Sequence, residues 1–290
     1  MQLLNILLSV TLFLIMISVG SSIELRHLKR IFQRPKRLIW GLVLQIVLFP
    51  AFAFLIASIS NLPVEYKVGL IILAACPGGA LSNFITYLIK GDTALSVSLT
   101  STNSLVILLT IPIYLSLAFT TFLNQSITVT LPVLNLILQV LILVIIPVLI
   151  GSTLRYFKPK QTLKIQTPLK IFSSILLAVF FTIKVFGPTS IGGIGITKEL
   201  VLTIFPWALL LNIGGLFLGF LIMKALKSNN KIATTMGIEV GLQNTILALL
   251  ITDVILLQPM LGHPALIYGM FTFWTTLVFG ILFVRNKRKK

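Results

Sequence analysis

Residues 68–83 read Val-Gly-Leu-Ile-Ile-Leu-Ala-Ala-Cys-Pro-Gly-Gly-Ala-Leu-Ser-Asn, an uncharged run with helix-breaking residues inside it. The run stays uncharged to residue 89, so it reaches the roughly 20 residues that span the hydrocarbon core of a bilayer. Pro77 lacks a backbone donor, and Gly78 and Gly79 each disfavour a helix by about 1 kcal/mol relative to alanine. A simple hydrophobic span would not carry these residues. We therefore predict a transmembrane helix that is interrupted near mid-membrane.

The rest of the chain also has the composition of a membrane protein. Of its 290 residues, 57% are hydrophobic and 10% are charged, and the mean hydropathy is +1.07. Soluble proteins contain about 25% charged residues, so this class is excluded. The fold class is all-α and polytopic. The apolar runs predict nine transmembrane helices, at residues 3–22, 37–59, 67–89, 93–118, 131–152, 168–187, 200–223, 232–256 and 264–284.

The net charge of +17 lies in short segments between the apolar runs, which argues against a nucleic-acid partner and for a lipid bilayer. With nine spans, only Lys67, Lys184 and Lys198 fall on one side, which leaves 20 of the 23 basic residues on the other. The positive-inside rule then places the N-terminus outside the cell membrane and the C-terminus, with a basic tail at 285–290, in the cytoplasm. The sixth span is short, so Lys184 is expected to reach outward to water.

A second interruption is predicted in the eighth span, where residues 237–244 read Gly-Ile-Glu-Val-Gly-Leu-Gln-Asn. A carboxylate at mid-membrane costs a few kcal/mol unless it faces the interior of the bundle, so Glu239 is expected to have partners. The third and eighth spans hold corresponding places in two halves, spans 1–4 and 6–9. Interrupted spans in such places are typical of the binding site of a secondary transporter built from inverted repeats.

Residues 76–83, residues 87–96 with Thr100, and residues 239–244 together resemble the bile acid:sodium symporter family. The resemblance implies a bacterial member with nine spans rather than ten, in which the two interrupted helices cross. It implies a panel domain at about 3–36 and 153–199 and a core domain at about 37–152 and 200–284, within one transporter unit. It also implies alternating access, with import of an organic anion coupled to two Na⁺ ions. The sequence has no His-Glu metal cluster, no paired intramembrane Asp residues and no Ser/His dyad within the membrane, so we do not expect an enzyme.

Sodium is a hard cation that takes oxygen ligands, and the motifs offer them: a carboxylate at Glu239 and hydroxyls on one helix face at Ser96 and Thr100. For a single hydroxyl such as Ser96 or Thr100, the competing interpretation is a hydrogen bond back to a carbonyl group of its own helix. For Gln45, the competing interpretation is a hydrogen bond between helices. By resemblance, the first sodium site consists of Ser82, Asn83, Ser96, Thr100 and Glu239. By resemblance, the second consists of Gln45, Glu239, Val240, Leu242 and Gln243.

Broken helices present half-helix N-termini, which attract carboxylates, so the substrate is expected to be a small organic anion. The candidate binding groups are the amides of Ala80 and Leu81, the side chain of Asn244, and Thr275. Several members of the family have threonine in place of Ala80 and a His-Asn pair in place of Thr275-Thr276, so the substrate is left open. It is a bile-acid-like anion or a small carboxylate such as pantoate, ketopantoate or another keto acid.

Two other functions remain as alternatives. A related carrier that exports an anion such as arsenite would have to use Cys76, the only thiol in the chain. A non-transport membrane scaffold would leave Glu239 and the two breaks unexplained, and nothing in the sequence points to an obligate protein partner. Outside the motifs, Asp253 is expected to be a hydrated helix end near the outer surface.

Overall fold

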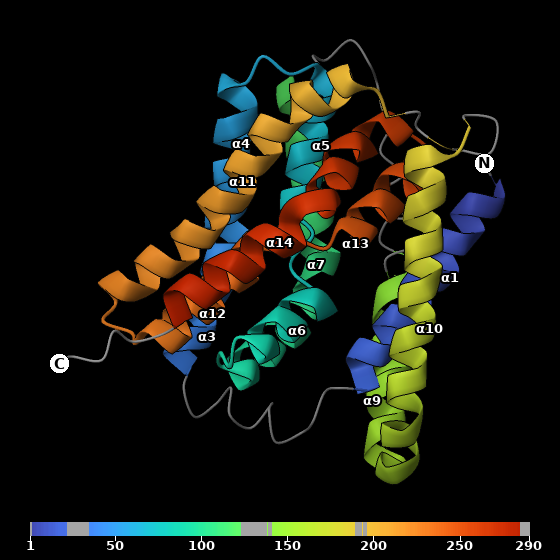
Figure 1. Ribbon diagram of the computed structural model, residues 1–290, viewed down its shortest axis with the longest axis vertical. Helices are drawn as coiled ribbons and strands as arrows, with labels where there is room; N and C mark the ends of the chain where they lie inside the picture. The colour runs from blue at the N-terminus through green and yellow to red at the C-terminus, as the bar shows by residue number, and fades with distance from the viewer. Residues whose placement is uncertain are drawn as a thin grey trace.

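The computed structural model describes residues 2–21, 35–122, 138, 141–188, 193 and 196–284, and the regular structure in these residues is helical (Figure 1). The predicted all-α class is confirmed to that extent. Most of the first basic cluster, residues 131–137 of the fifth predicted span and the basic tail at 285–290 lie outside the described residues.

The helices in chain order are α1 (Gln2–Ser21), α3 (Pro35–Val43), the π-helical η1 (Leu44–Leu48), α4 (Phe49–Ile59), α5 (Val64–Ala74), α6 (Ala80–Leu88), α7 (Thr93–Phe122), the π-helical η2 (Leu141–Ile145), α9 (Ile146–Phe157), α10 (Pro159–Phe186), α11 (Lys198–Ala225), α12 (Asn230–Gly241), α13 (Thr245–Leu249), the π-helical η4 (Leu250–Ile255), the 3₁₀ turn η5 (Pro259–Gly262) and α14 (His263–Val284).

Within the described residues, six helical segments are long and apolar enough to cross a membrane, and α7 makes a seventh if its two parts are one span. These parts, Thr93–Ser104 and Leu109–Phe122, are bent by 68°. The third predicted span is divided into two short helices, α5 and α6, and part of the fifth is the shorter apolar helix Leu141–Phe157. The part of the chain that the structure describes therefore contains six to seven helices of full membrane-spanning length.

The helices form two bundles (Figure 1). The smaller bundle consists of α1, α9 and α10, which pack on one another, and we refer to it below as the three-helix bundle. At the crossing of α1 and α9, a Cβ atom on Gly20 would lie 2.1 Å from the Val148 carbonyl oxygen. Small residues let membrane helices approach this closely. The predicted panel–core boundary at residue 152 falls inside α9, which packs on α1.

The larger bundle contains α3 to α7 and α11 to α14, and the two interruptions meet inside it. Residues 75–79 separate α5 from α6, and residues 242–244 separate α12 from α13. The Asn244 amide donates a hydrogen bond of 3.0 Å to the Cys76 carbonyl oxygen, which joins the two breaks directly. A Cβ atom on Gly78 would lie 2.6 Å from the Leu242 carbonyl oxygen, so the contact requires glycine.

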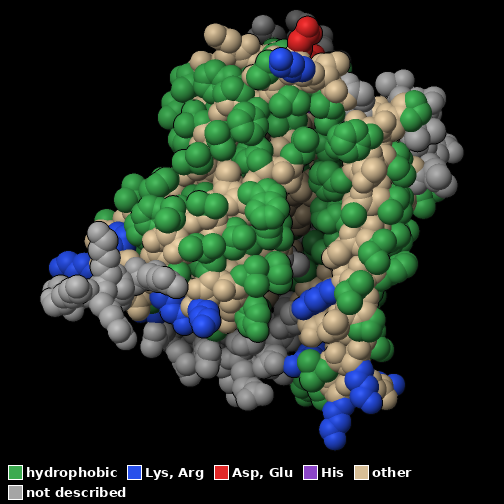
Figure 2. Space-filling view, in the orientation of Figure 1, with side chains coloured by type: hydrophobic (Ala, Val, Ile, Leu, Met, Phe, Trp, Pro, Cys, Tyr) green, Lys and Arg blue, Asp and Glu red, His purple; other side chains and the backbone are tan. Residues whose placement is uncertain are grey.

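The surface follows the charge pattern of the sequence. Hydrophobic side chains cover the middle of the visible face, and Lys and Arg side chains gather towards its lower end (Figure 2). A furrow on this face separates α10 from the larger bundle. This distribution fits a protein whose middle faces lipid.

Two expectations about charged side chains near the upper end are wrong. Lys184 does not reach out to water: its side chain is 4% exposed, and Nζ lies 2.5 Å from Asp253 Oδ2. Asp253 is correspondingly buried rather than hydrated. The reason is that α10 is 28 residues long and places Lys184 against η4, where the two charges compensate each other.

Candidate cation and substrate site

The candidate site is centred on Glu239, whose side chain is fully buried. Helix α12 brings it there. The helix begins at an Asn229 cap, whose Oδ1 accepts a hydrogen bond of 3.0 Å from the Ile232 amide, and it ends at Gly241, directly before the second break. Glu239 therefore occupies the last turn of α12. The carbonyl groups of that turn lack partners within the helix, and the negative end of the helix dipole favours a cation.

Hydroxyl and amide oxygens from α6 and α7 surround the Glu239 carboxylate. The Ser96 hydroxyl lies 2.5 Å from Glu239 Oε1 and 2.6 Å from Asn83 Oδ1. The Thr100 hydroxyl lies 3.2 Å from Glu239 Oε2 and 3.4 Å from Asn83 Oδ1. Ser82 interacts with the same carboxylate and also donates to the Gly79 carbonyl oxygen at 2.8 Å. The five residues predicted for the first sodium site thus lie together.

This cluster has more acceptors than donors. Ser82, Ser96 and Thr100 have one hydroxyl proton each, whereas the two Glu239 oxygens, Asn83 Oδ1 and the Gly79 carbonyl oxygen all face them as acceptors. Among the described residues, no Lys, Arg or His forms an ion pair with Glu239. A buried carboxylate among surplus oxygens, with no protein cation beside it, is chemically suited to hold a hard metal cation.

A second group of oxygens lies around the end of α12. Gln45 Nε2 donates to the Glu239 carbonyl oxygen at 2.6 Å, and Gln243 Nε2 donates to the Val240 carbonyl oxygen at 2.7 Å. Gln243 Oε1 is buried and has no hydrogen-bond partner among the described residues. The Leu242 carbonyl oxygen faces Gly78 of the other break. The residues predicted for the second sodium site are therefore neighbours, with carbonyl and amide oxygens among them.

The π-helical segment η1 positions Gln45, and proline accounts for its geometry. Pro50 has no amide hydrogen, so the Ile46 carbonyl oxygen, four residues earlier, loses its helical partner. The helix widens over Leu44–Leu48, and the Tyr114 hydroxyl donates to the Ile46 oxygen instead. Irregular turns of this kind often occur at functional sites.

Sequence reasoning missed three residues that contact this region. Asn103 on α7 donates to Gln45 Oε1, while its own Oδ1 is buried and has no hydrogen-bond partner in the described part of the chain. Asn212 Nδ2 on α11 donates to the Gly241 carbonyl oxygen at 2.7 Å, and the Tyr268 hydroxyl on α14 donates to the same oxygen. These residues occupy apolar spans far from the motifs in sequence. The only signal for Asn103 and Asn212 was an intramembrane amide.

The residues predicted for the substrate do not all share one place. A cavity of about 10 Å³, which holds about one water molecule, lies between α1 and the two breaks. Asn244 is in its wall, but its Oδ1 also caps α13 by accepting from the Leu247 amide at 3.1 Å. Leu81 and Thr275 are not in the cavity wall. The cavity is lined by Met16, Val19, Pro77, Gly78, Gly79, Thr100, Ser104, Ile107, Asn244 and Leu247.

Two of the predicted substrate residues lie elsewhere in the larger bundle. Leu81 is 41% exposed in the first turn of α6. The Thr275 hydroxyl on α14 donates to Asn212 Oδ1 at 2.6 Å, so it reaches the second break only through Asn212. The Ala80 amide belongs to the first turn of α6, which follows the first break. The structure therefore groups Asn244 with the glycines of the first break.

Comparisons with known proteins agree with this architecture. The family model described as Sodium Bile acid symporter family matches residues 9–191. The chain is 31% identical over 258 residues to a probable sodium/metabolite cotransporter of Arabidopsis thaliana chloroplasts, and the match covers 88% of this chain and 60% of that protein. It therefore spans less than two thirds of the length of that relative.

Two further relatives are covered over more of their length. The chain is 32% identical over 238 residues to an uncharacterized sodium-dependent transporter of Bacillus subtilis, with 81% of this chain and 71% of that protein covered. It is 31% identical over 269 residues to the human sodium-dependent organic anion transporter, with 91% and 68% covered. An alignment of the latter length has to include both breaks. On the family match and these identities together, the chain belongs to the sodium bile acid symporter family, a family of multi-pass membrane transporters rather than enzymes.

Proposed function

We propose that this protein is a secondary symporter that couples the import of an organic anion to the inward movement of Na⁺. The observation that carries the proposal is the buried Glu239 carboxylate, which lies among oxygens of Asn83, Ser96 and Thr100 with no ion-pair partner among the described residues. A protein that binds no cation would not require a buried negative charge where the two interrupted helices meet. A mobile cation would compensate this charge.

The proposed stoichiometry is two Na⁺ ions per substrate. The first ion would use Ser82, Asn83, Ser96, Thr100 and Glu239, and the second would use Gln45, Gln243 and the carbonyl groups of Glu239, Val240 and Leu242. With a monovalent anion, each tenfold Na⁺ gradient supplies about 1.4 kcal/mol. The one net charge adds about 2.3 kcal/mol per 100 mV. The total of roughly 5 kcal/mol would concentrate the substrate several thousand-fold.

The proposed cycle is alternating access between two bodies. We propose that the three-helix bundle of α1, α9 and α10 is the panel and that the larger bundle is the core. The cavity between α1 and the breaks is too small for an organic acid, so the two bodies would have to separate to admit one. The nine spans, the inverted repeats and the external N-terminus belong to this proposal.

The substrate is proposed to be a carboxylate that binds at the breaks, near Asn244 and the amides of Ala80 and Leu81 at the start of α6. Both a bile-acid-like anion and a small acid such as pantoate, ketopantoate or another keto acid fit this chemistry. The relatives include a protein named for organic anions and another named for metabolites.

Uptake by proteoliposomes tests the function directly. Purified protein is challenged with a panel of labelled organic acids under an inward Na⁺ gradient, an inward K⁺ gradient and no gradient. We expect accumulation of at least one acid only under the Na⁺ gradient. Equal uptake under the K⁺ gradient would contradict the proposal. So would a protein that takes up none of the acids and is also not stabilised by Na⁺ in a melting experiment. Transport that is lost in Cys76→Ala would instead favour an arsenite-type carrier.

A further inference from the structure

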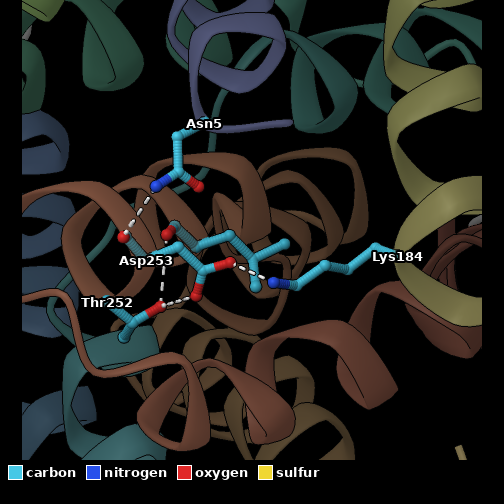
Figure 3. A network of polar contacts seen from close by, with 5 residues as sticks. Asn5, Lys184, Thr252 and Asp253 are labelled. Carbon is cyan, nitrogen blue, oxygen red and sulfur yellow. Dashed lines mark hydrogen bonds and ion pairs between the residues drawn. The ribbon is translucent and has the colours of Figure 1, made fainter. Parts of the chain in front are cut away.

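The clearest polar contact outside the site joins the two bundles through an ion pair. Lys184 on α10 places Nζ 2.5 Å from Asp253 Oδ2 on η4, and the two side chains are 4% and 2% exposed (Figure 3). Figure 3 shows the lysine side chain extending from α10 across to the carboxylate. Lys184 belongs to the three-helix bundle and Asp253 to the larger one. The charges therefore meet where the two bodies touch.

Neighbouring groups hold Asp253 in place from both bundles. The Thr252 hydroxyl donates to Asp253 Oδ1 at 3.1 Å, and Asn5 Nδ2 on α1 donates to the Asp253 carbonyl oxygen at 3.4 Å (Figure 3). A Cβ atom on Gly262 would lie 3.0 Å from Asp253 Oδ1, so the turn before α14 also packs against the carboxylate. Two helices of the three-helix bundle thus hold one residue of the larger bundle.

The energetics of a buried ion pair make this contact a bistable one. Removing one partner of a buried pair leaves a charge without compensation, which is strongly unfavourable, whereas two charges that separate into water are both hydrated. The pair is therefore stable when the bundles touch and when they are fully apart. Intermediate, dry separations are disfavoured. A contact with these properties suits the boundary between two discrete conformations.

We propose that Lys184 and Asp253 form a gate that holds the two bundles together on the side of the membrane opposite the main basic clusters, and that opens when the substrate site is exposed to that side. The proposal rests on the alternating access proposed above. Asp253 lies on the continuous helical segment Thr245–Ile255, which begins directly after Asn244, the last residue of the second break. A displacement of the break by bound ions or substrate would therefore move the gate residue as well.

Distance measurements across the gate test the proposal without a substrate. The chain has a single cysteine, so Cys76→Ala provides a background without thiols. Spin labels at Phe186→Cys and Met260→Cys would lie on exposed sites, 82% and 50% exposed, at the gate ends of α10 and the larger bundle. Electron–electron double resonance then reports the populations of short and long separations.

We expect the short separation to dominate in the parent protein. Lys184→Met and Asp253→Asn each remove one charge, so each should shift the ratio of long to short separations by at least about tenfold. The exchange of charges in Lys184→Asp/Asp253→Lys should restore most of the short population. Lys170→Met, which removes an exposed lysine from the same helix, should leave the distribution unchanged.

Two results would overturn the gate. One is that Lys184→Met and Asp253→Asn both fold and both give the same distance distribution as Lys170→Met. The other is an exchanged pair that behaves no better than the single variants. The gate and the symport function can fail separately. If the parent shows Na⁺-driven uptake but the variants do not shift, only the gate is refuted; if the variants shift but the parent shows no Na⁺ coupling, only the symport is refuted.

Discussion

Glu239 carries the functional proposal at the scale of single residues. Its two oxygens, Asn83 Oδ1 and the Gly79 carbonyl oxygen share three hydroxyl protons, those of Ser82, Ser96 and Thr100. Because the acceptors outnumber the protons, the cluster has unsatisfied oxygen lone pairs inside the protein, where an unsatisfied group costs free energy. A cation relieves this deficit, and the same reasoning predicts what happens when the charge is removed.

Glu239→Gln should abolish Na⁺-dependent uptake and also the stabilisation of the protein by Na⁺. Binding at 100 times the dissociation constant stabilises a protein by about 2.7 kcal/mol, and the variant should lose this gain in a melting experiment with and without Na⁺. Glu199→Gln, at an exposed position in the first turn of α11, is the matched control and should behave like the parent. A Na⁺ dependence that survives in Glu239→Gln would remove the basis of the cation site.

Asn103 is a positioning residue for Gln45 in this proposal. Gln45 now turns Nε2 towards the Glu239 carbonyl oxygen and Oε1 towards Asn103. To offer Oε1 to an ion, the Gln45 amide would turn over, and Nε2 would then face Asn103. Asn103 Oδ1, which is buried and has no hydrogen-bond partner within the described ranges, is an acceptor available for it.

Asn103→Leu should therefore weaken the dependence on Na⁺ without removing any direct ligand. Changes to groups that hold metal ligands lower metal affinity about 10–100-fold, so the half-saturating Na⁺ concentration for uptake should rise by that factor. Thr102→Val is the control, since the Thr102 hydroxyl bonds back to the Ser98 carbonyl oxygen of its own helix. A purely structural role for Asn103 would lower expression or maximal rate and leave the Na⁺ dependence unchanged.

At the scale of helices, the breaks and π-helical turns follow from a few residues that cannot form regular helix. Pro77 and its two glycines end α5, and residues 242–244 separate α12 from α13. Pro50 removes the helical partner of the Ile46 carbonyl oxygen, which accepts from the Tyr114 hydroxyl instead, and the widened turn η1 carries Gln45. Each irregular segment frees backbone carbonyl groups where the site lies, which is tolerated in a membrane only where protein groups or a cavity replace the lost partners.

Gly78→Ala tests the contact between the two breaks. The added methyl group would lie 2.6 Å from the Leu242 carbonyl oxygen, a backbone atom that cannot rotate away. We expect a loss of about 1–3 kcal/mol of stability, measured by thermal unfolding in detergent, together with loss of uptake. Gly79→Ala, whose methyl group would meet only the Asn244 side chain at 3.3 Å, should be milder. Equal behaviour of the two variants would argue against a tight contact at Gly78.

At the scale of the whole molecule, the orientation in the membrane is the main prediction still to be tested. In the Cys76→Ala background, single cysteines at Lys160 and Lys227 should react with an impermeant thiol reagent only after the cells are permeabilised. Cysteines at Lys198 and Met260 should react in intact cells. The positive-inside rule makes this prediction, because 20 of the 23 basic residues lie on the proposed cytoplasmic side. The reverse pattern would reject the nine-span topology, and so would labelling of the cysteines at positions 160 and 198 from the same side of the membrane.

The amino-acid sequence alone determined the membrane class, the places of both interruptions and the isolated carboxylate at Glu239. These features depend on the transfer of single residues into hydrocarbon and on the backbone limits of proline and glycine, which are local properties. Only the tertiary structure decided that Asn103 contacts Gln45, that Asn212 and Tyr268 meet the end of α12, and that Lys184 pairs with Asp253 instead of reaching water. Contacts of this kind depend on the rotation and crossing of helices far apart in the chain, which packing sets and hydropathy does not record.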